Sequence, residues 1–153
     1  MKRYIEIEKL VYQEIEKNCF GNKKRNGYRH LFGVSQLCIL YSTRFQLDQE
    51  LCAIMGLLHD YSVYKNNTSF NHAVLSSELA EKLLKETLLF DEKEIEIVVE
   101  AIKNHSTKNK VHDQYSELLK MCDVLETYYH DPNCIFDEYH QKFIEKASLL
   151  LNK

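Results

Sequence analysis

Glycine and proline are scarce in this chain, and this scarcity limits the folds that it can adopt. The 153 residues include four glycines and one proline. Tight turns depend on these residues, and a sheet-rich domain needs many tight turns. The composition therefore predicts long helices joined by few connections. A hydrophobic fraction of 44% is enough for one core at this length, so we expect a single all-α domain over residues 1–153.

Apolar residues recur at helical spacing along most of the sequence, which predicts about six to seven helices. The expected ranges are 3–18, 28–45, 49–59, 71–87, 92–105, 114–130 and 135–151. Residues 49–59 are apolar nearly all round, which favours a central position for that helix. Asp48 is expected to cap it, and Asp91 with Glu94 forms a capping-box pattern before the helix over 92–105.

Polar segments between these ranges are predicted to be loops. Residues 18–26 include the basic run Lys23–Arg25, which is either a solvated loop or a rim that attracts phosphate. Residues 61–70 form a second polar segment. Pro132 is expected to break the chain before the last helix.

Charge and cysteine content predict the compartment and the partners of the protein. The net charge of -3 gives no global attraction to nucleic acid or to an anionic membrane. Five cysteines occur without a CxxC pair, the amino-terminal segment is charged, and no apolar run reaches membrane-spanning length. We therefore expect a cytoplasmic protein with reduced thiols, no membrane partner and no strong nucleic-acid signal. The oligomeric state stays open.

Six side chains that can bind a metal lie on or beside the apolar faces of the expected helices. They are His30, His59, Asp60, His72, His105 and Asp123. Burying such groups costs free energy unless they share a partner, and a divalent ion is the natural candidate. Nitrogen and oxygen donors suit iron, manganese, zinc, nickel or cobalt, and the lack of cysteine in the set argues against structural zinc. Because one catalytic ion needs fewer than six donors, two ions are plausible.

The order His…His-Asp…His…His…Asp resembles the HD-domain superfamily of metal-dependent phosphohydrolases. The local contexts are similar as well: GLLHD at 56–60, NHAVLSSELAEKLL at 71–84, AIKNHS at 101–106 and KMCDVLE at 120–126. The resemblance covers a ligand-bearing core of about residues 28–127, and it implies a helical HD-domain bundle.

The resemblance also implies a role for each of the six residues. Four of them would hold a first ion: His30, His59, Asp60 and Asp123. His72 and His105 would hold a second ion, with Asp60 bridging the two. The one or two ions would provide a metal-bound hydroxide that hydrolyses a phosphoester or phosphoanhydride of a small metabolite or nucleotide. Asp60 would also orient this hydroxide, which makes Asp60 the expected catalytic residue.

Two basic residues are candidates for binding the substrate phosphate. Lys65 lies five residues after Asp60, whereas dinuclear relatives often place a lysine three residues after their aspartate, where this chain has Val63. Lys65 either takes over the role of that lysine from a shifted position or is an ordinary surface lysine. Arg29 adjoins His30 and is the second candidate.

Two other functions remain open at this stage. Some HD-domain proteins use the same six ligands to hold two irons and activate dioxygen, so the chain could be a di-iron oxygenase. It could also be a non-catalytic module that binds a metal or a nucleotide. The ligand set alone does not choose among these functions.

Overall fold

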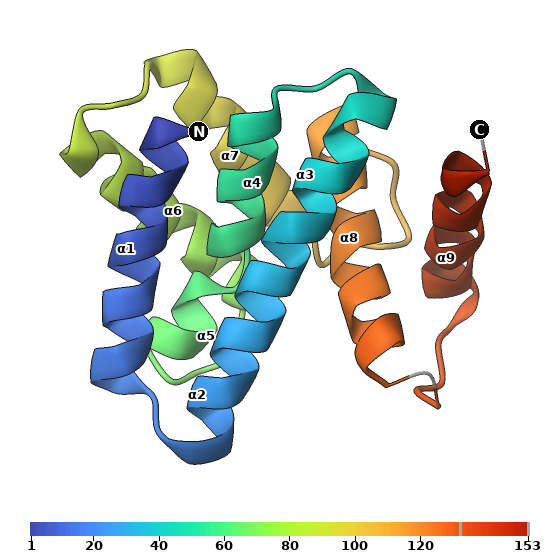
Figure 1. Ribbon diagram of the computed structural model, residues 1–153, viewed down its shortest axis with the longest axis horizontal. Coiled ribbons are helices and arrows are strands. Elements are labelled where there is room, and N and C mark those ends of the chain that lie inside the picture. Colours follow the sequence, from blue (N-terminus) through green and yellow to red (C-terminus); the bar gives the residue numbers. More distant parts are fainter. Residues whose placement is uncertain (132, 153) are drawn as a thin grey trace.

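The computed structural model describes residues 1–131 and 133–152, which form helices and no strand (Figure 1). Among these residues, seven helices have ten or more residues: α1 (Lys2–Asn18), α3 (Gly33–Phe45), α4 (Gln49–Leu58), α6 (His72–Thr87), α7 (Glu92–Asn104), α8 (Gln114–His130) and α9 (Glu138–Leu151). Shorter elements are α2 (Gly21–Gly27), the π-helical segment η1 (Tyr28–Phe32) and α5 (Tyr61–Lys65). The expected all-α fold is confirmed, while the expected break at Pro132 lies outside the described residues.

Side-chain caps explain why two of the long helices begin where the sequence predicts. The carboxylate of Asp48 accepts a hydrogen bond of 2.8 Å from the backbone N–H of Leu51, at the start of α4. At the start of α7, Asp91 accepts from the backbone N–H of Glu94, and the Glu94 carboxylate accepts from the backbone N–H of Asp91. These bonds satisfy N–H groups that the first turn of a helix leaves unpaired.

Two segments that the sequence predicts to be loops contain helix instead. Part of the expected loop over 18–26 is α2, which continues through η1 into α3. Part of the polar segment 61–70 is α5, where Tyr61 and Tyr64 are buried. Such short helices show no clear periodicity in sequence, and packing of the two tyrosines stabilises α5 more than its helix propensity does.

The central helix α4 is in contact with α1, α3, α7 and α8, as its apolar sequence predicts. Residues Leu51–Leu58 are all buried, and full burial of a leucine side chain contributes roughly 1.5–3 kcal/mol. The contact with α3 is especially close, because a Cβ atom on Gly56 would lie 2.6 Å from the Cα of Ser35. Only glycine permits this approach of two helix backbones.

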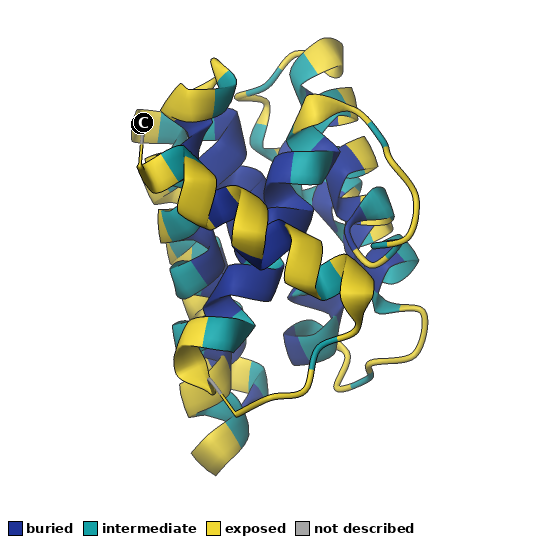
Figure 2. Ribbon diagram, turned by 90° about the vertical axis from the view of Figure 1, so that its right-hand side faces the viewer, coloured by how far each residue is buried: buried dark blue, intermediate teal, exposed yellow. Residues whose placement is uncertain are grey.

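The outer helices cover this core with one face each. In Figure 2, buried residues lie between the helices and exposed residues on their outer surfaces. Helix α9 packs against α8 and turns Phe143, Ile144 and Ala147 inward. None of the described helices combines the length and the apolar character needed to cross a membrane.

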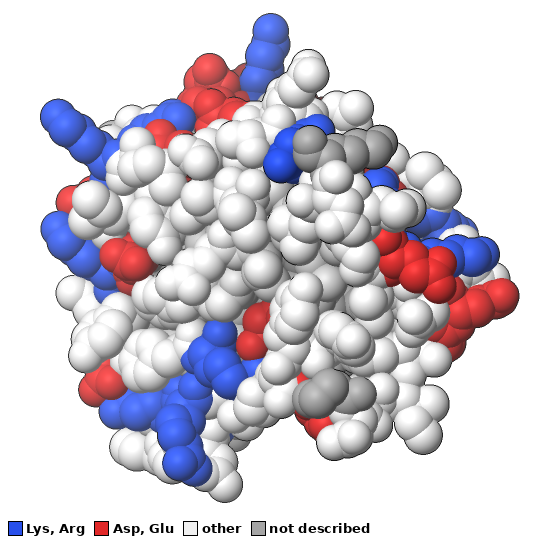
Figure 3. All heavy atoms as spheres, turned by 45° about the vertical axis from the view of Figure 1, so that its right-hand side comes forward, with Lys and Arg blue, Asp and Glu red and all other residues white. Residues whose placement is uncertain are grey.

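Charged side chains of both signs share the surface. On the face that Figure 3 displays, lysines and arginines form separate groups, with acidic side chains beside several of them.

Candidate metal centre

His59 and Asp60 directly follow α4, so the central helix ends at the candidate site. The His59 side chain is fully buried, and its Nδ1 lies 2.8 Å from the backbone oxygen of Gly56. This oxygen is one of the carbonyls that the last turn of a helix leaves unpaired. Because a carbonyl only accepts hydrogen bonds, Nδ1 donates its proton and Nε2 keeps a free lone pair in the neutral ring.

Two further histidines are fixed in the same way. His105 follows α7, and its Nδ1 lies 2.6 Å from the backbone oxygen of Ile102. His72 begins α6, and its Nδ1 lies 3.2 Å from the backbone oxygen of Ser69. In each neutral ring the lone pair is therefore on Nε2, the atom that faces the carboxylate of Asp60.

His30 reaches the site from η1, and a carboxylate rather than a carbonyl holds its Nδ1. The Nδ1 of His30 lies 2.5 Å from Oε2 of Glu126, on α8. The guanidinium of Arg29 contacts the other oxygen of the same carboxylate. Single turns of π-helix often occur at functional sites, and here the π-helical segment carries both residues that contact Glu126.

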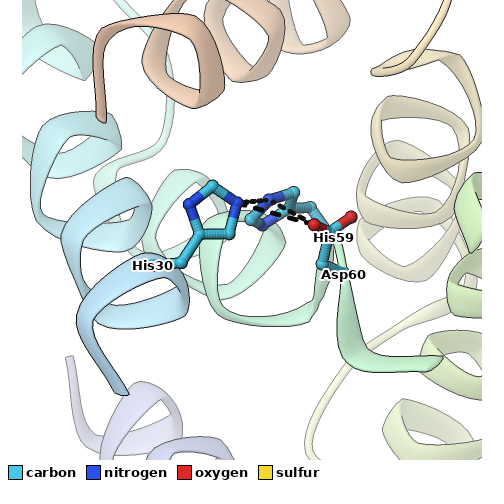
Figure 4. A group of neighbouring side chains, drawn as sticks. All are labelled: His30, His59 and Asp60. Carbon is cyan, nitrogen blue, oxygen red and sulfur yellow. Dashed lines mark hydrogen bonds and ion pairs between the residues drawn. The ribbon is translucent and has the colours of Figure 1, made fainter. Parts of the chain in front are cut away.

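A first group of donor atoms lies around the Nε2 atoms of His30 and His59, which are 3.0 Å apart (Figure 4). Oδ2 of Asp60 lies 3.5 Å from the His30 nitrogen and 3.6 Å from the His59 nitrogen. Oδ1 of Asp123 lies 3.4 Å and 3.7 Å from the same two atoms. The four residues expected to hold a first ion are therefore brought together.

A second group of donor atoms lies around the other oxygen of Asp60. Oδ1 of Asp60 is 3.3 Å from Nε2 of His105 and 3.5 Å from Nε2 of His72. This oxygen is buried and has no hydrogen-bond partner among the described residues. Asp60 thus faces both groups, one with each oxygen, and all six expected ligands converge.

The two groups differ in their access to solvent. In the first group His59 is buried and the side chains of His30 and Asp123 are 12% and 19% exposed, whereas in the second group the His72 side chain is 32% exposed. The centre is therefore most open to solvent at His72. Only three donors form the second group, so it leaves coordination positions for water or another ligand, as catalytic metal sites do.

The charges around the centre favour a cation. Burial raises the pKa of the Asp60 carboxyl, but the neighbouring imidazoles of His59 and His105 outweigh burial and hold this pKa well below its usual range. For Asp123, Lys108 and His30 likewise outweigh burial and lower the carboxyl pKa. Burial lowers the pKa of His30, but hydrogen bonds with Asp123, Asp60 and Glu126 raise it to about 12. The acceptors around His30 thus favour a positive charge at this position.

The two basic residues predicted to bind substrate differ in their positions. Lys65 turns away from the centre, because its Nζ lies 3.4 Å from the carboxylate of Glu14 on α1 and faces the ring of Tyr61. Arg29 lies beside the centre but is engaged by Glu126. The structure therefore does not bring Lys65 into the group.

The sequence pattern did not identify two of the residues that lie at the centre. Lys108 places its Nζ 2.6 Å from Oδ2 of Asp123, and Glu126 holds His30. Each follows a predicted ligand by three residues, Lys108 after His105 and Glu126 after Asp123. For Glu126 this spacing is one helical turn, a signal that could have identified it.

Comparison with known proteins agrees with this geometry. The solved structures include the crystal structure of a predicted HD superfamily hydrolase from an uncultured Thermotogales bacterium, which matches with a TM-score of 0.62 and 18% sequence identity. The match covers 94% of this chain and 87% of that chain and shows a shared fold. None of the curated proteins matches the chain significantly. The model of the HD domain family matches residues 27–128, which include all six expected ligands, and the chain therefore belongs to this family.

Proposed function

We propose that this protein is a metal-dependent phosphohydrolase that cleaves a phosphoester or phosphoanhydride of a small metabolite or nucleotide. The observation that carries the proposal is the buried Oδ1 of Asp60, which has no hydrogen-bond partner among the described residues. A buried carboxylate oxygen without a partner is costly. A cation between this oxygen and the Nε2 atoms of His72 and His105 would remove the cost.

The donor set fits two divalent ions that share Asp60. The first group offers two imidazole nitrogens and two carboxylate oxygens, and the second offers two imidazole nitrogens and one carboxylate oxygen. Such donors suit iron, manganese, zinc, nickel or cobalt. When bound, the ions would supply an activated water and positive charge for a phosphate group.

The side chains themselves would bind and orient the reactants. Asp60 lies between the two groups, where its carboxylate can accept a hydrogen bond from a water and direct it toward the phosphorus atom. Arg29 has N–H groups that Glu126 does not engage, and these can donate to a phosphate oxygen. The contact of Lys65 with Glu14 favours Arg29 over Lys65 for this role.

Phosphate release by the metal-loaded protein tests the proposal. The protein is loaded with each candidate metal in turn and offered phosphomonoesters, nucleotides and dinucleotide polyphosphates. We expect turnover by the wild type and a loss of about 100-fold or more in Asp60→Asn, which keeps the shape of the side chain but loses its charge. Glu78→Gln is the matched control, because Glu78 is an exposed acidic residue of α6.

Two outcomes would overturn the proposal. Substrate-dependent oxygen uptake without phosphate release would assign the centre to di-iron oxygenase chemistry. Metal binding without turnover on the whole panel would favour a non-catalytic binding module. Circular dichroism of Asp60→Asn checks that the helices are intact.

A further inference from the structure

Glu126 occupies a position beside the centre that the six expected ligands do not explain. Its side chain is only 8% exposed, although it carries a charge. One oxygen lies 2.5 Å from Nδ1 of His30, and the other contacts the guanidinium of Arg29. Buried carboxylates are rare unless they are paired, and this one is paired on both oxygens.

The chain also leaves space for this carboxylate. A Cβ atom on Gly33, the first residue of α3, would lie 2.9 Å from Cγ of Glu126. Any larger residue at position 33 would therefore displace the Glu126 side chain. Gly33, Arg29 and His30 belong to consecutive turns of one helical segment, so α3 and η1 together form the cradle in which Glu126 lies.

The hydrogen bond of Glu126 determines which nitrogen of His30 faces the centre. With Nδ1–H donating to the carboxylate, Nε2 is the atom directed toward His59, Asp60 and Asp123. A carboxylate acceptor also makes the opposite nitrogen a stronger electron-pair donor than a carbonyl acceptor does. In His59, His72 and His105 the Nδ1 atom faces a backbone carbonyl instead. Among these four rings, His30 is therefore the one whose Nδ1 faces a carboxylate.

We propose that Glu126 is a positioning residue that orients His30 and strengthens its Nε2 as a ligand, and so sets the affinity of the first ion. Arg29 contacts the second oxygen of Glu126 and so restricts the orientation of the carboxylate. The inference rests on the proposed metal centre. In this role Glu126 contacts neither the substrate nor an ion.

Metal competition with a chelator tests the proposal on the purified full chain, without substrate. We expect Glu126→Gln, which keeps an acceptor oxygen but loses the charge, to lower the affinity for the first ion. Glu126→Ala should lower this affinity about 10–100-fold. The second ion, held by His72 and His105, should keep its affinity in both variants. Glu78→Gln is the control for loss of an acidic side chain.

Cobalt(II) provides a readout that a loss of folding would not imitate. We expect the visible absorption of cobalt at the site of the first ion to change in Glu126→Gln. The absorption of cobalt at the site of the second ion should stay the same. Gly33→Ala leaves the Glu126 carboxylate chemically intact but displaces it, so it should give the same selective loss of first-ion affinity.

The outcomes separate this inference from the proposed function. A wild type that binds no metal would overturn the proposed function itself. A wild type that binds two ions, with unchanged first-ion affinity and spectrum in both Glu126 variants, would overturn only the role of Glu126.

Discussion

The ammonium of Lys108 lies 2.6 Å from Oδ2 of Asp123, while Oδ1 of the same carboxylate faces the Nε2 atoms of His30 and His59. Lys108 also donates to the backbone oxygen of His105, at 2.6 Å. Its side chain is only 8% exposed. A single lysine therefore connects a carboxylate of the first group to the segment that carries a histidine of the second group.

We expect Lys108→Met to destabilise the metal-free protein by about 2–3 kcal/mol, because it leaves Oδ2 of the largely buried Asp123 carboxylate without its partner. A divalent ion would compensate that carboxylate in turn. The rise in melting temperature on loading with metal should therefore be larger in Lys108→Met than in the wild type. Thermal unfolding with and without a chelator measures both effects.

Lys110→Met is the control for this comparison, since Lys110 lies in the same loop and its side chain is exposed. It should behave like the wild type in both conditions. Equal stabilisation by metal in all three proteins would contradict the role that we give to Lys108.

The two-ion arrangement predicts a specific pattern of metal content. His72→Ala and His105→Ala each remove a donor from the second group, so bound metal should fall from two ions to about one per chain. His30→Ala should instead lower the affinity for the first ion. Elemental analysis of protein dialysed against a fixed metal concentration gives the stoichiometry. Two ions per chain in all three variants would show that the assignment of donors is wrong.

The order of residues in the chain was sufficient to predict the six converging side chains, because each is tied to a helix end or an apolar stripe. His59 and His105 illustrate this, since each follows a helix whose boundaries the apolar spacing predicts. Lys108 and Glu126 could not be recognised in this way. Both are charged residues that apolar periodicity places on the surface. The one-turn spacing of Glu126 from Asp123 indicates its side of α8, but the packing of α8 is what brings Asp123 to Lys108 and Glu126 to His30.

The same limit explains the wrong predictions for two short helices and the position of Lys65. The helices α2 and α5, in segments predicted to be loops, are too short for their periodicity to be visible in the sequence. Lys65 is the last residue of α5, and this helix directs its side chain toward Glu14. An extended loop over the centre would have permitted the contact that the sequence suggested.

Lys65→Met tests the position of that lysine. Because Lys65 pairs with Glu14 and faces the ring of Tyr61, we expect unchanged metal affinity and an unchanged KM for any substrate that the wild type hydrolyses. The loss of a partly exposed ion pair should cost at most about 1 kcal/mol of stability. Arg29→Met is the comparison, and it should raise KM. A raised KM in Lys65→Met would return Lys65 to the substrate site.

Gly56 links the packing of the core to the centre, because its backbone oxygen accepts the hydrogen bond of His59 and its Cα faces α3. In Gly56→Ala the new Cβ would lie 2.6 Å from Cα and 2.9 Å from the backbone nitrogen of Ser35. Backbone atoms cannot rotate away as side chains do, so α3 and α4 must separate. We expect a loss of about 1–3 kcal/mol in the free energy of unfolding, together with weaker metal binding because His59 moves with α4.

Gly33→Ala provides the contrast for Gly56→Ala. Its Cβ would meet the side chain of Glu126 rather than backbone, so stability should fall less while first-ion affinity still falls. Chemical denaturation of the metal-free proteins measures stability, and chelator competition measures affinity. If Gly56→Ala were as stable as the wild type, the close approach of α3 and α4 would be wrong, and with it the position from which α4 presents His59.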